Sequence, residues 1–389
     1  MKNKFSVFLG LVFLVFITSF LTQVVISNYG FIYNFDLGIY TSEDISFFNR
    51  FINSKYLLKN KFYKEIDNSI LYEGALRGMV DAIEDPYTEY LDQEESKDLK
   101  ESIGHEYDGI GVYLQHDTQD NTIKVVSVIE DTPAKVAGIL ANDKILKIDG
   151  IEYTGEKIDD AILKIRDSKD KIVILTVLRN GETKEISVEC KHLKLDTVTS
   201  EWKNDIGYLR ISEFGDETGE EFKAHYDKLR AQNIKGLIID MRNNTGGVYE
   251  EVIKIAKILI PEGLIVYTQD KDGNKEEIFS ESEGIDIPLV VLVNEYSASA
   301  SEVLAGAIKD RECGTLIGAK TYGKGVIQGV YDMPDGTAMK VTIAKYYTPN
   351  GICIDGVGIE PNKEVKVTTN EKDEQLDEAI KLISEKVKW

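Results

Sequence analysis

Residues 289–302 read Leu-Val-Val-Leu-Val-Asn-Glu-Tyr-Ser-Ala-Ser-Ala-Ser-Glu, and their character changes abruptly after the apolar run. A continuous apolar run of this kind is typical of a strand that is buried on both faces. Small residues follow, and residues 303–310 have a helical pattern. Ser299 therefore falls near a helix N-terminus, where free N–H groups and the helix dipole favour negative charge on a hydroxyl. Serines there also act as ordinary N-caps, so both interpretations stay open.

Strands and helices alternate on both sides of this stretch. The alternation predicts an α/β core over residues 192–370, followed by a charged amphipathic helix within residues 371–389. Further strands are predicted at residues 207–211, 237–241 and 264–268, and further helices at 218–231 and 250–259.

A serine nucleophile needs a base that accepts its proton. The four histidines stand in no motif-like setting, although a triad that assembles only in space stays open; they are His105, His116, His192 and His225.

Lysine offers another base in the segment Thr321-Tyr-Gly-Lys-Gly-Val-Ile-Gln328. Glycines flank Lys324, so its amine can enter a tight pocket. Lowering a lysine pKa from about 10.4 to 7–8 takes roughly 4 kcal/mol of differential solvation, which burial in apolar surroundings supplies. An extended chain would put Lys324, Val326 and Gln328 on one face, with Gln328 orienting the amine. The other interpretation is a solvated surface lysine.

A third segment, Asp240-Met-Arg-Asn-Asn-Thr-Gly-Gly247, follows a strand that looks buried. Its two glycines expose backbone N–H groups without side-chain cover, and acyl transfer needs such donors for the oxyanion. Gly246 or Gly247 would supply one donor, and Ala300 the second. An ordinary strand-to-helix loop fits the same residues.

Residues 106–191 have a different pattern, which predicts a compact and mostly β module. Gly, Asp and Asn turns separate its short strands, predicted at 111–114, 123–129, 144–148, 172–178 and 185–190. Two short helices are predicted at 133–137 and 158–165.

The N-terminus carries Lys2 and Lys4 before an apolar run over residues 5–26, and no further Lys or Arg occurs until Arg50. This asymmetry predicts export, with the amino end inside. Residues 1–27 are expected to be a membrane anchor, or a signal segment if they are cleaved. Residues 28–105 are expected to form a helical arm that packs or dimerises, with a helical pattern over 45–99 and a turn at Asp85-Pro86.

Composition narrows the class of protein. The 389 residues carry a formal charge of −21, which argues against a nucleic-acid-binding surface because such surfaces need clustered Lys and Arg. The three cysteines are scattered singly and are expected to be small buried hydrophobes, although one disulfide that leaves an odd thiol stays open. No metal-ligand spacing is present, so we expect neither a metal nor an organic cofactor.

Several segments together resemble the carboxyl-terminal processing (tail-specific) peptidases, a serine peptidase family that uses a Ser-Lys dyad. The matching segments are Ser-Ala-Ser-Ala-Ser-Glu at 297–302, residues 321–328 quoted above, Tyr-Tyr-Thr-Pro-Asn-Gly at 346–351 and Gly-Val-Gly-Ile-Glu-Pro at 356–361. Residues 73–80 and 85–90 resemble the family's helical arm. The resemblance covers nearly everything from about residue 70 to about residue 365.

The resemblance implies a ClpP/crotonase-like peptidase core joined to a PDZ domain. It places the nucleophile at Ser299, the base at Lys324 and the orienting glutamine at Gln328, with Ser297 and Ser301 as structural neighbours. It also implies that Asp108-Gly-Ile-Gly-Val112 is the carboxylate-binding loop of the PDZ domain, whose peptide-binding residues would be Gly109, Ile110, Gly111 and Val112. One departure is Asp167-Ser-Lys-Asp170, which replaces the usual glycine-containing turn.

The function expected from these residues is that of an exported serine endopeptidase whose substrates are proteins or peptides with free C-terminal tails. We expect it at the cell membrane with its body on the extracytoplasmic side, or secreted if residues 1–27 are removed, and homodimerisation through the arm or the last helix stays open. One alternative is a membrane-tethered PDZ scaffold with an inactive peptidase core. The other is a non-peptidase enzyme on the same fold, which also supports acyl-thioester chemistry.

Overall fold

The computed structural model describes residues 41–203, 205–366 and 372–387, so the expected anchor at residues 1–27 and the start of the arm lie outside it. Within those ranges, no helix has both the length and the apolar character that crossing a membrane requires. The chain divides into two compact units at residues 78 and 79.

The first unit consists of helix α2 (Ser42–Lys61) and most of helix α3 (Asn68–Asp81). A reciprocal capping box begins α2: Asp44 N–H donates to Thr41 Oγ1 (3.2 Å) and Thr41 N–H donates to Asp44 Oδ2 (2.7 Å). Large apolar side chains of α2, among them Phe47, Ile52 and Leu57, are exposed.

The second unit begins within α3 and continues through strand β1 (Glu89–Leu91) and helix α4 (Gln93–Gly104). The helical pattern predicted over residues 45–99 is therefore correct for α2, α3 and most of α4. It is wrong at β1, because β1 pairs with a strand far away in the sequence, which local periodicity does not reveal.

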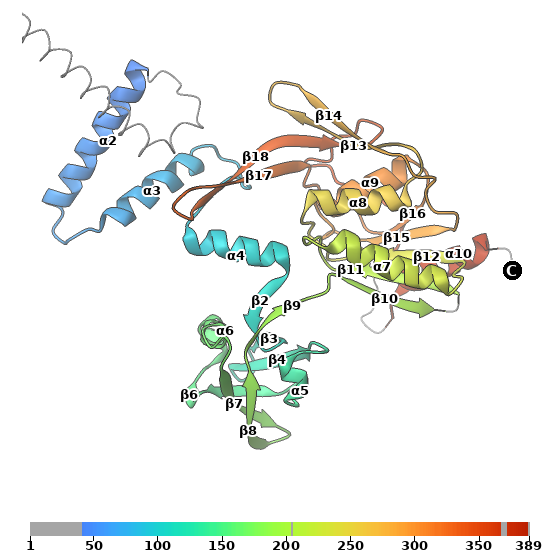
Figure 1. The fold of residues 1–389 in the computed structure, drawn as a ribbon, viewed down its shortest axis with the longest axis horizontal. Helices are drawn as coiled ribbons and strands as arrows, with labels where there is room; N and C mark the ends of the chain where they lie inside the picture. The colour runs from blue at the N-terminus through green and yellow to red at the C-terminus, as the bar shows by residue number, and fades with distance from the viewer. Residues whose placement is uncertain (1–40, 204, 367–371, 388–389) are drawn as a thin grey trace, which may run out of the picture. The chain divides into compact units, whose positions relative to one another are not determined.

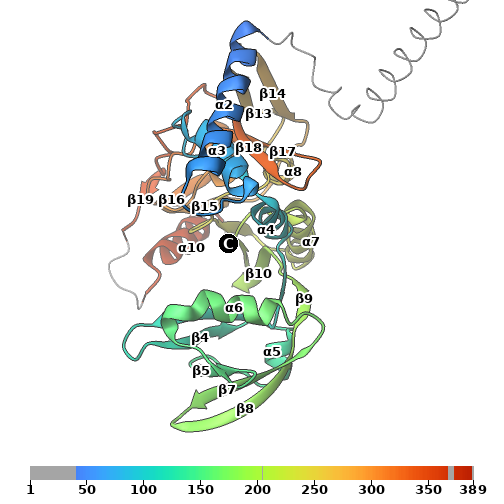
Figure 2. The ribbon, with the colours of Figure 1, turned by 90° about the vertical axis from the view of Figure 1, so that its left-hand side faces the viewer.

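The expected PDZ domain is a compact antiparallel sheet in the order β3-β4-β5-β7-β8, with β6 beside β5. Figure 2 shows β4, β5, β7 and β8 of this sheet. Its strands are β3 (Val112–Asp117), β4 (Thr122–Val128), β5 (Lys144–Ile148), β6 (Ile151–Glu152), β7 (Ile172–Arg179) and β8 (Glu182–Glu189). Its helices are α5 (Pro133–Val136), the 3-10 turn η2 (Gly155–Lys157) and α6 (Ile158–Arg166). The mostly β module is thus confirmed. The turn that lacks glycine is built by Asp170 at φ +58°, a left-handed conformation that Asp tolerates better than most residues.

A two-stranded antiparallel ribbon precedes and follows the PDZ domain in the chain. It consists of β2 (Glu106–Gly109) and β9 (Lys191–Lys194). His192 of β9 contacts Asp108 and Glu106 across the ribbon.

The α/β core is built on a six-stranded sheet in the order β10-β11-β12-β15-β16-β19, parallel except for β10 (Figure 1). The strands are β10 (Val198–Lys203), β11 (Ile206–Ile211), β12 (Gly236–Asp240), β15 (Leu289–Val293), β16 (Thr315–Gly318) and β19 (Lys363–Glu364). The helices are α7 (Thr218–Ala231), α8 (Tyr249–Leu259), α9 (Ala300–Asp310) and α10 (Glu374–Lys386).

Both faces of this sheet are buried, as the apolar runs predict. Leu237, Ile239 and Val291 pack against α7, α8 and α9, whereas the alternating Ile238 and Val290 pack against α10. Figure 1 shows these two sets of helices on opposite sides of the sheet. The predicted α/β fold is confirmed, together with the mostly β module and the N-terminal helices.

A second, antiparallel sheet completes the core and was largely unforeseen, since the sequence predicts only part of β13. It comprises β1, β13 (Gly263–Asp270), β14 (Lys275–Ser280), β17 (Val326–Asp332) and β18 (Ala338–Tyr347). Figure 1 shows β17 and β18 side by side as a long ribbon. This sheet supplies one wall of the cavity described next.

Candidate active site

Ser299 lies at the junction between β15 and α9, as the N-cap of α9. Its backbone has φ +56° and ψ −115°, a conformation that an L-residue rarely adopts and that costs on the order of 1–3 kcal/mol. The neighbouring serines hold the turn in place: Ser297 Oγ donates to Met241 O (2.8 Å), and Ser301 Oγ donates to Asn244 O (3.0 Å). Their hydroxyls are fully buried and committed to the backbone, which leaves Ser299 as the serine that lines the cavity.

Glu302 connects the Ser299 turn to the loop that carries Lys324. Its side chain is 0% exposed. One oxygen accepts from Thr321 Oγ1 (2.6 Å) and Gly323 N–H (2.7 Å), and the other accepts from the backbone N–H groups of Ser299 (2.9 Å) and Lys324 (2.8 Å). Burial raises the pKa of the Glu302 carboxyl, while the four hydrogen bonds act in the opposite direction. No role for Glu302 was predicted from the sequence, although a Glu three residues after an N-cap Ser is a recognisable capping signal.

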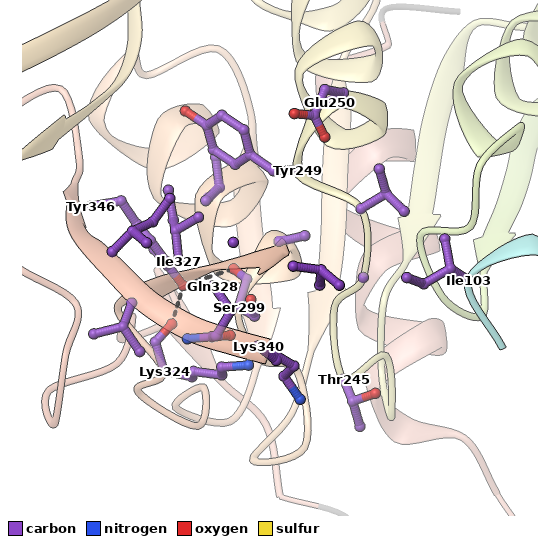
Figure 3. Close-up of a pocket in the computed structure, with 18 of the residues that line it drawn as sticks. Ile103, Thr245, Tyr249, Glu250, Ser299, Lys324, Ile327, Gln328, Lys340 and Tyr346 are labelled. Carbon is purple, nitrogen blue, oxygen red and sulfur yellow. Dashed lines mark hydrogen bonds between the residues drawn. The ribbon is translucent and has the colours of Figure 1, made fainter. Parts of the chain in front are cut away.

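Tyr346 makes a second connection between the same two segments. Its buried phenol donates to the backbone carbonyls of Ser299 (3.0 Å) and Lys324, as the dashed lines in Figure 3 show. Burial raises the pKa of this phenol well above its usual value, so it remains a donor at every physiological pH. Glu302 and Tyr346 thus fix the relative position of the Ser299 and Lys324 backbones.

The amine of Lys324 lies at 4.7 Å from the centroid of the Tyr87 ring. Burial lowers the lysine pKa, and the charge of Lys340 lowers it further, whereas Asp85 and Glu89 raise it. The net direction is the one that a neutral base requires. No hydrogen bond joins the Lys324 amine to Ser299 Oγ among the described residues, and an unliganded site often has such looser geometry.

A cavity of about 510 Å³ contains both side chains. Figure 3 shows Ser299, Lys324 and Lys340 projecting toward the same space. Most of its lining is apolar, contributed by residues such as Leu99, Val303, Val326, Ile327 and Ile343.

Gln328 also lines this cavity, but it does not orient the lysine amine in this structure. Its side-chain amide donates to Thr342 Oγ1 (3.3 Å). The simple strand alternation assumed from the sequence is interrupted, because β17 begins only at Val326 and has a register shift between Ile327 and Gln328. The orienting role of Gln328 therefore stays a prediction.

The two glycines of the expected oxyanion site differ. Gly246 N–H already donates to Asn244 Oδ1 (2.9 Å), so this amide is not free to bind an oxyanion. Gly246 instead provides close approach, since a Cβ there would lie 2.8 Å from Ser299 Cβ. Within the described residues, the N–H groups of Gly247 and Ala300 have no hydrogen-bond acceptor, and both residues line the cavity. Gly247 and Ala300 are therefore the remaining candidates.

None of the four histidines lines the cavity. His225 Nδ1 contacts Ser200 Oγ (2.7 Å), His105 contacts Glu213, and His192 belongs to the β2–β9 ribbon. A Ser-His-Asp triad at Ser299 is thereby excluded in this conformation. Among the described residues, no cluster of His, Cys, Asp or Glu could hold a metal ion.

The predicted peptide-binding loop of the PDZ domain lines a separate, smaller groove of about 60 Å³. Gly109, Ile110, Gly111 and Val112 form one side, and α6 contributes Ile162, Ile165 and Arg166. Strand β3 is at the sheet edge beside this groove, so its backbone can accept an added strand.

A serine on a strained strand-to-helix turn, joined through two buried side chains to a lysine loop and linked to a PDZ domain, is the arrangement of a serine peptidase with a peptide-binding module. Comparison with known proteins agrees. Residues 205–365 match Peptidase family S41, residues 109–190 match the PDZ domain, and residues 40–95 match the Activating protease CtpB N-terminal domain. The chain therefore contains a peptidase family S41 domain, a PDZ domain and an N-terminal domain of the CtpB type.

Its relatives support this assignment. A "Probable CtpA-like serine protease" of Staphylococcus haemolyticus is 34% identical over 312 residues, which cover 79% of this chain and 62% of the relative. The protein with the same description from Staphylococcus epidermidis is 35% identical over 312 residues, which cover 79% of this chain and 63% of the relative. The chain thus spans just under two thirds of the length of these curated relatives. Among solved structures, the photosystem II D1 C-terminal processing protease is similar at a TM-score of 0.51 and 27% identity, covering 84% of this chain and 94% of that protein.

Proposed function

We propose that this protein is an exported serine endopeptidase that cleaves proteins recognised by their C-terminal tails, with Ser299 as nucleophile and Lys324 as general base. One observation carries the proposal: both side chains line one cavity, in which burial lowers the pKa of the lysine amine. A PDZ scaffold with an inactive core has no use for a desolvated lysine beside a strained serine.

The proposed reaction begins when substrate binding brings the neutral amine of Lys324 within reach of Ser299 Oγ. The amine takes the hydroxyl proton while Oγ forms a bond to the scissile carbonyl carbon. The N–H groups of Gly247 and Ala300 bind the negative oxygen that develops. The C–N bond then breaks, and the Lys324 ammonium gives its proton to the departing amine.

Water completes the cycle. Lys324 takes a proton from the water as its oxygen attacks the acyl-ester carbon, and the same N–H groups bind the second oxyanion. The bond to Ser299 Oγ breaks, Oγ recovers the proton from Lys324, and the product leaves as a carboxylic acid.

Substrate selection is proposed to occur at the groove between β3 and α6. The carboxylate of a free C-terminus would bind the N–H groups of the loop that contains Gly109 and Gly111, and the tail would add to the edge of β3. The apolar groove lining favours an apolar last residue. A peptide with a free C-terminal carboxylate should bind this groove. The same peptide with an amidated C-terminus should not bind.

Location and assembly are also part of the proposal. The Lys2 and Lys4 asymmetry and the apolar residues 5–26 support export with a membrane anchor. The exposed apolar side chains of α2 support a homodimer through that helix. Fractionation of the full chain tests the first point, and sedimentation of the wild type against Leu57→Glu tests the second.

Cleavage of an unfolded protein tests the catalytic claim. Ser299→Ala and Lys324→Ala should each abolish turnover, whereas Lys223→Ala, which removes an exposed lysine of α7, should not. Cleavage at the wild-type rate by either of the first two variants would overturn the dyad. Wild-type protein that binds a tail peptide but cleaves nothing would favour the scaffold.

A further inference from the structure

Residues 85–91, called the cover segment below, lie directly against the proposed base. The aromatic ring of Tyr87 faces the Lys324 amine at 4.7 Å from the ring centroid. This segment comes from the N-terminal side of the PDZ domain, whereas Lys324 lies in the α/β core. The contact between Tyr87 and Lys324 therefore forms only when the chain brings the cover segment back onto the α/β core.

The cover segment is held against β18 by specific contacts. Thr342 N–H donates to Thr88 Oγ1 (3.0 Å), and the same hydroxyl donates to Asp85 Oδ2 (2.5 Å). Strand β1 pairs with β18 so that Glu89 lies opposite Lys340, and their side chains form an ion pair at 2.6 Å. Tyr90 is buried. These contacts fix the Tyr87 ring where it meets the lysine.

The ring acts on the amine in two opposite ways. It excludes water, which disfavours the ammonium form, and its π face attracts a cation, which favours that form. Burial is the largest cause of the lowered lysine pKa, and the Tyr87 ring is part of the surroundings that cover this amine.

Three charged groups also face the amine. Lys340 on β18 disfavours the ammonium form, whereas Asp85 and Glu89 of the cover segment favour it. Glu89 and Lys340 carry opposite charges and pair with each other, so their effects on the Lys324 pKa partly cancel. Desolvation by burial is therefore the main cause of the lowered pKa. Tyr322 and Asp355 act on the Tyr87 phenol.

We propose that the cover segment is part of the catalytic site, with Tyr87 as a positioning residue that shields the Lys324 amine from water, and that the site is competent only while this segment is seated on β18. The inference rests on the proposed function, since it assigns Tyr87 a role through Lys324. It adds a means of control, because displacing the segment would hydrate and protonate the base without disturbing Ser299.

The test is the pH dependence of Ser299 labelling by a fluorophosphonate probe, measured together with kcat for an unfolded substrate. Tyr87→Ala uncovers the amine and should move the acidic limb of both profiles to higher pH, with a loss of about tenfold at neutral pH for each unit of movement. Tyr87→Phe keeps the ring and should restore the profile. Tyr87→Leu keeps apolar cover without the π face, so its limb should lie at or below that of the wild type.

Tyr63→Ala is the matched control, because Tyr63 also faces a lysine, Lys64, at 5.0 Å but is 79% exposed. Its profile should equal that of the wild type. If Tyr87→Ala fails to fold by circular dichroism, Tyr87→Gln against Tyr87→Leu makes the same comparison between polar and apolar cover.

The outcomes separate this inference from the proposed function. Superimposable profiles for the wild type and Tyr87→Ala, or for the Gln and Leu variants, would overturn the inference while the dyad stands. Labelling that persists in Ser299→Ala would overturn the proposed function itself.

Discussion

Two neighbouring strands of the central sheet end in turns that bury a carboxylate completely, and the two turns satisfy it in different ways. After β12, Asp240 is bound by the guanidinium of Arg242 (2.6 Å) and by the Tyr208 phenol (2.7 Å), and Arg242 extends the network to Asp373 (2.7 Å). After β15, Glu302 accepts only from one hydroxyl and three backbone N–H groups. Within the described parts of the chain, no Lys or Arg side chain pairs with Glu302.

The difference separates a turn with a structural role from the turn that carries the proposed nucleophile. A guanidinium compensates the buried charge of Asp240 and anchors the start of α10. Lys324, by contrast, binds Glu302 only through its backbone N–H, so its amine is not held as a counter-ion. An ion pair there would favour the ammonium form and remove the base.

Breaking the ion pair after β12 should have the largest effect on stability. Asp240→Asn leaves the Arg242 charge without its buried partner, so the free energy of unfolding should fall by about 3–5 kcal/mol. Urea titration followed by circular dichroism measures it. Asp227→Asn, which breaks an exposed pair with Lys223, should change stability by about 0.5 kcal/mol or less. A loss below 1 kcal/mol for Asp240→Asn would remove the structural interpretation of this turn.

The neighbouring pair of Arg242 with Asp373 gives a pH dependence that acid titration of stability would measure. The hydrogen bonds from Arg242 hold the pKa of Asp373 below its usual value. A carboxyl whose folded-state pKa is depressed contributes stability above its unfolded pKa and loses it as pH falls through the folded value. The contribution of Arg242 should therefore be complete at neutral pH and should weaken below about pH 4.

Glu302→Gln should have the next largest effect, because the amide keeps one acceptor oxygen and turns an NH2 group toward N–H donors. Two donors lose their acceptor, at a combined cost of about 2–4 kcal/mol. Because the Ser299 and Lys324 backbones then separate, kcat should fall about a hundredfold, with little change in KM. Folded Glu302→Gln with a normal kcat would show that this carboxylate does not position the dyad.

Tyr346→Phe should have a smaller effect, since it removes one donor that two carbonyls share. We expect a loss of about 1–2 kcal/mol in stability and about tenfold in kcat. Tyr226→Phe serves as the control, because this partly buried tyrosine stacks on Phe222 away from the cavity. Equal effects of the two substitutions on kcat would argue against a specific role for Tyr346.

The smallest effect expected is a shift in pH profile for Lys340→Gln. The Lys340 charge lowers the pKa of Lys324, so its removal should raise that pKa and move the acidic limb of kcat to higher pH. Lys223→Gln should leave the profile in place. Movement of the limb to lower pH in Lys340→Gln would contradict the proposed sign of this interaction.

The central sheet and the PDZ domain were predictable because their signals are local. Residues 289–293 and 218–231 match β15 and α7 as predicted, since apolar runs and helical periodicity identify such elements. Sequence motifs also identified three residues that line one cavity, namely Ser299, Lys324 and Gln328.

The antiparallel sheet and the residues around the dyad were not predictable in the same way. Strands β17 and β18 pair through a register shift. Strand β1 precedes the PDZ domain in the sequence and pairs with β18, which follows that domain. The roles of Tyr87, Glu302 and Tyr346 arise from contacts between segments that are distant in sequence, which no local pattern encodes.

A direct titration of Lys324 measures whether its amine can be neutral near neutral pH. NMR of protein labelled with 13C at the lysine ε-carbons, with the signal assigned by its absence in Lys324→Arg, follows the protonation of this amine. An unperturbed lysine, with a pKa of about 10.4, is the reference for a solvated amine. Lys324 should lose its proton at a pH clearly below that value, and Tyr87→Ala should narrow the difference. Titration of Lys324 at or above that value would show that its amine is not the neutral base that the mechanism requires.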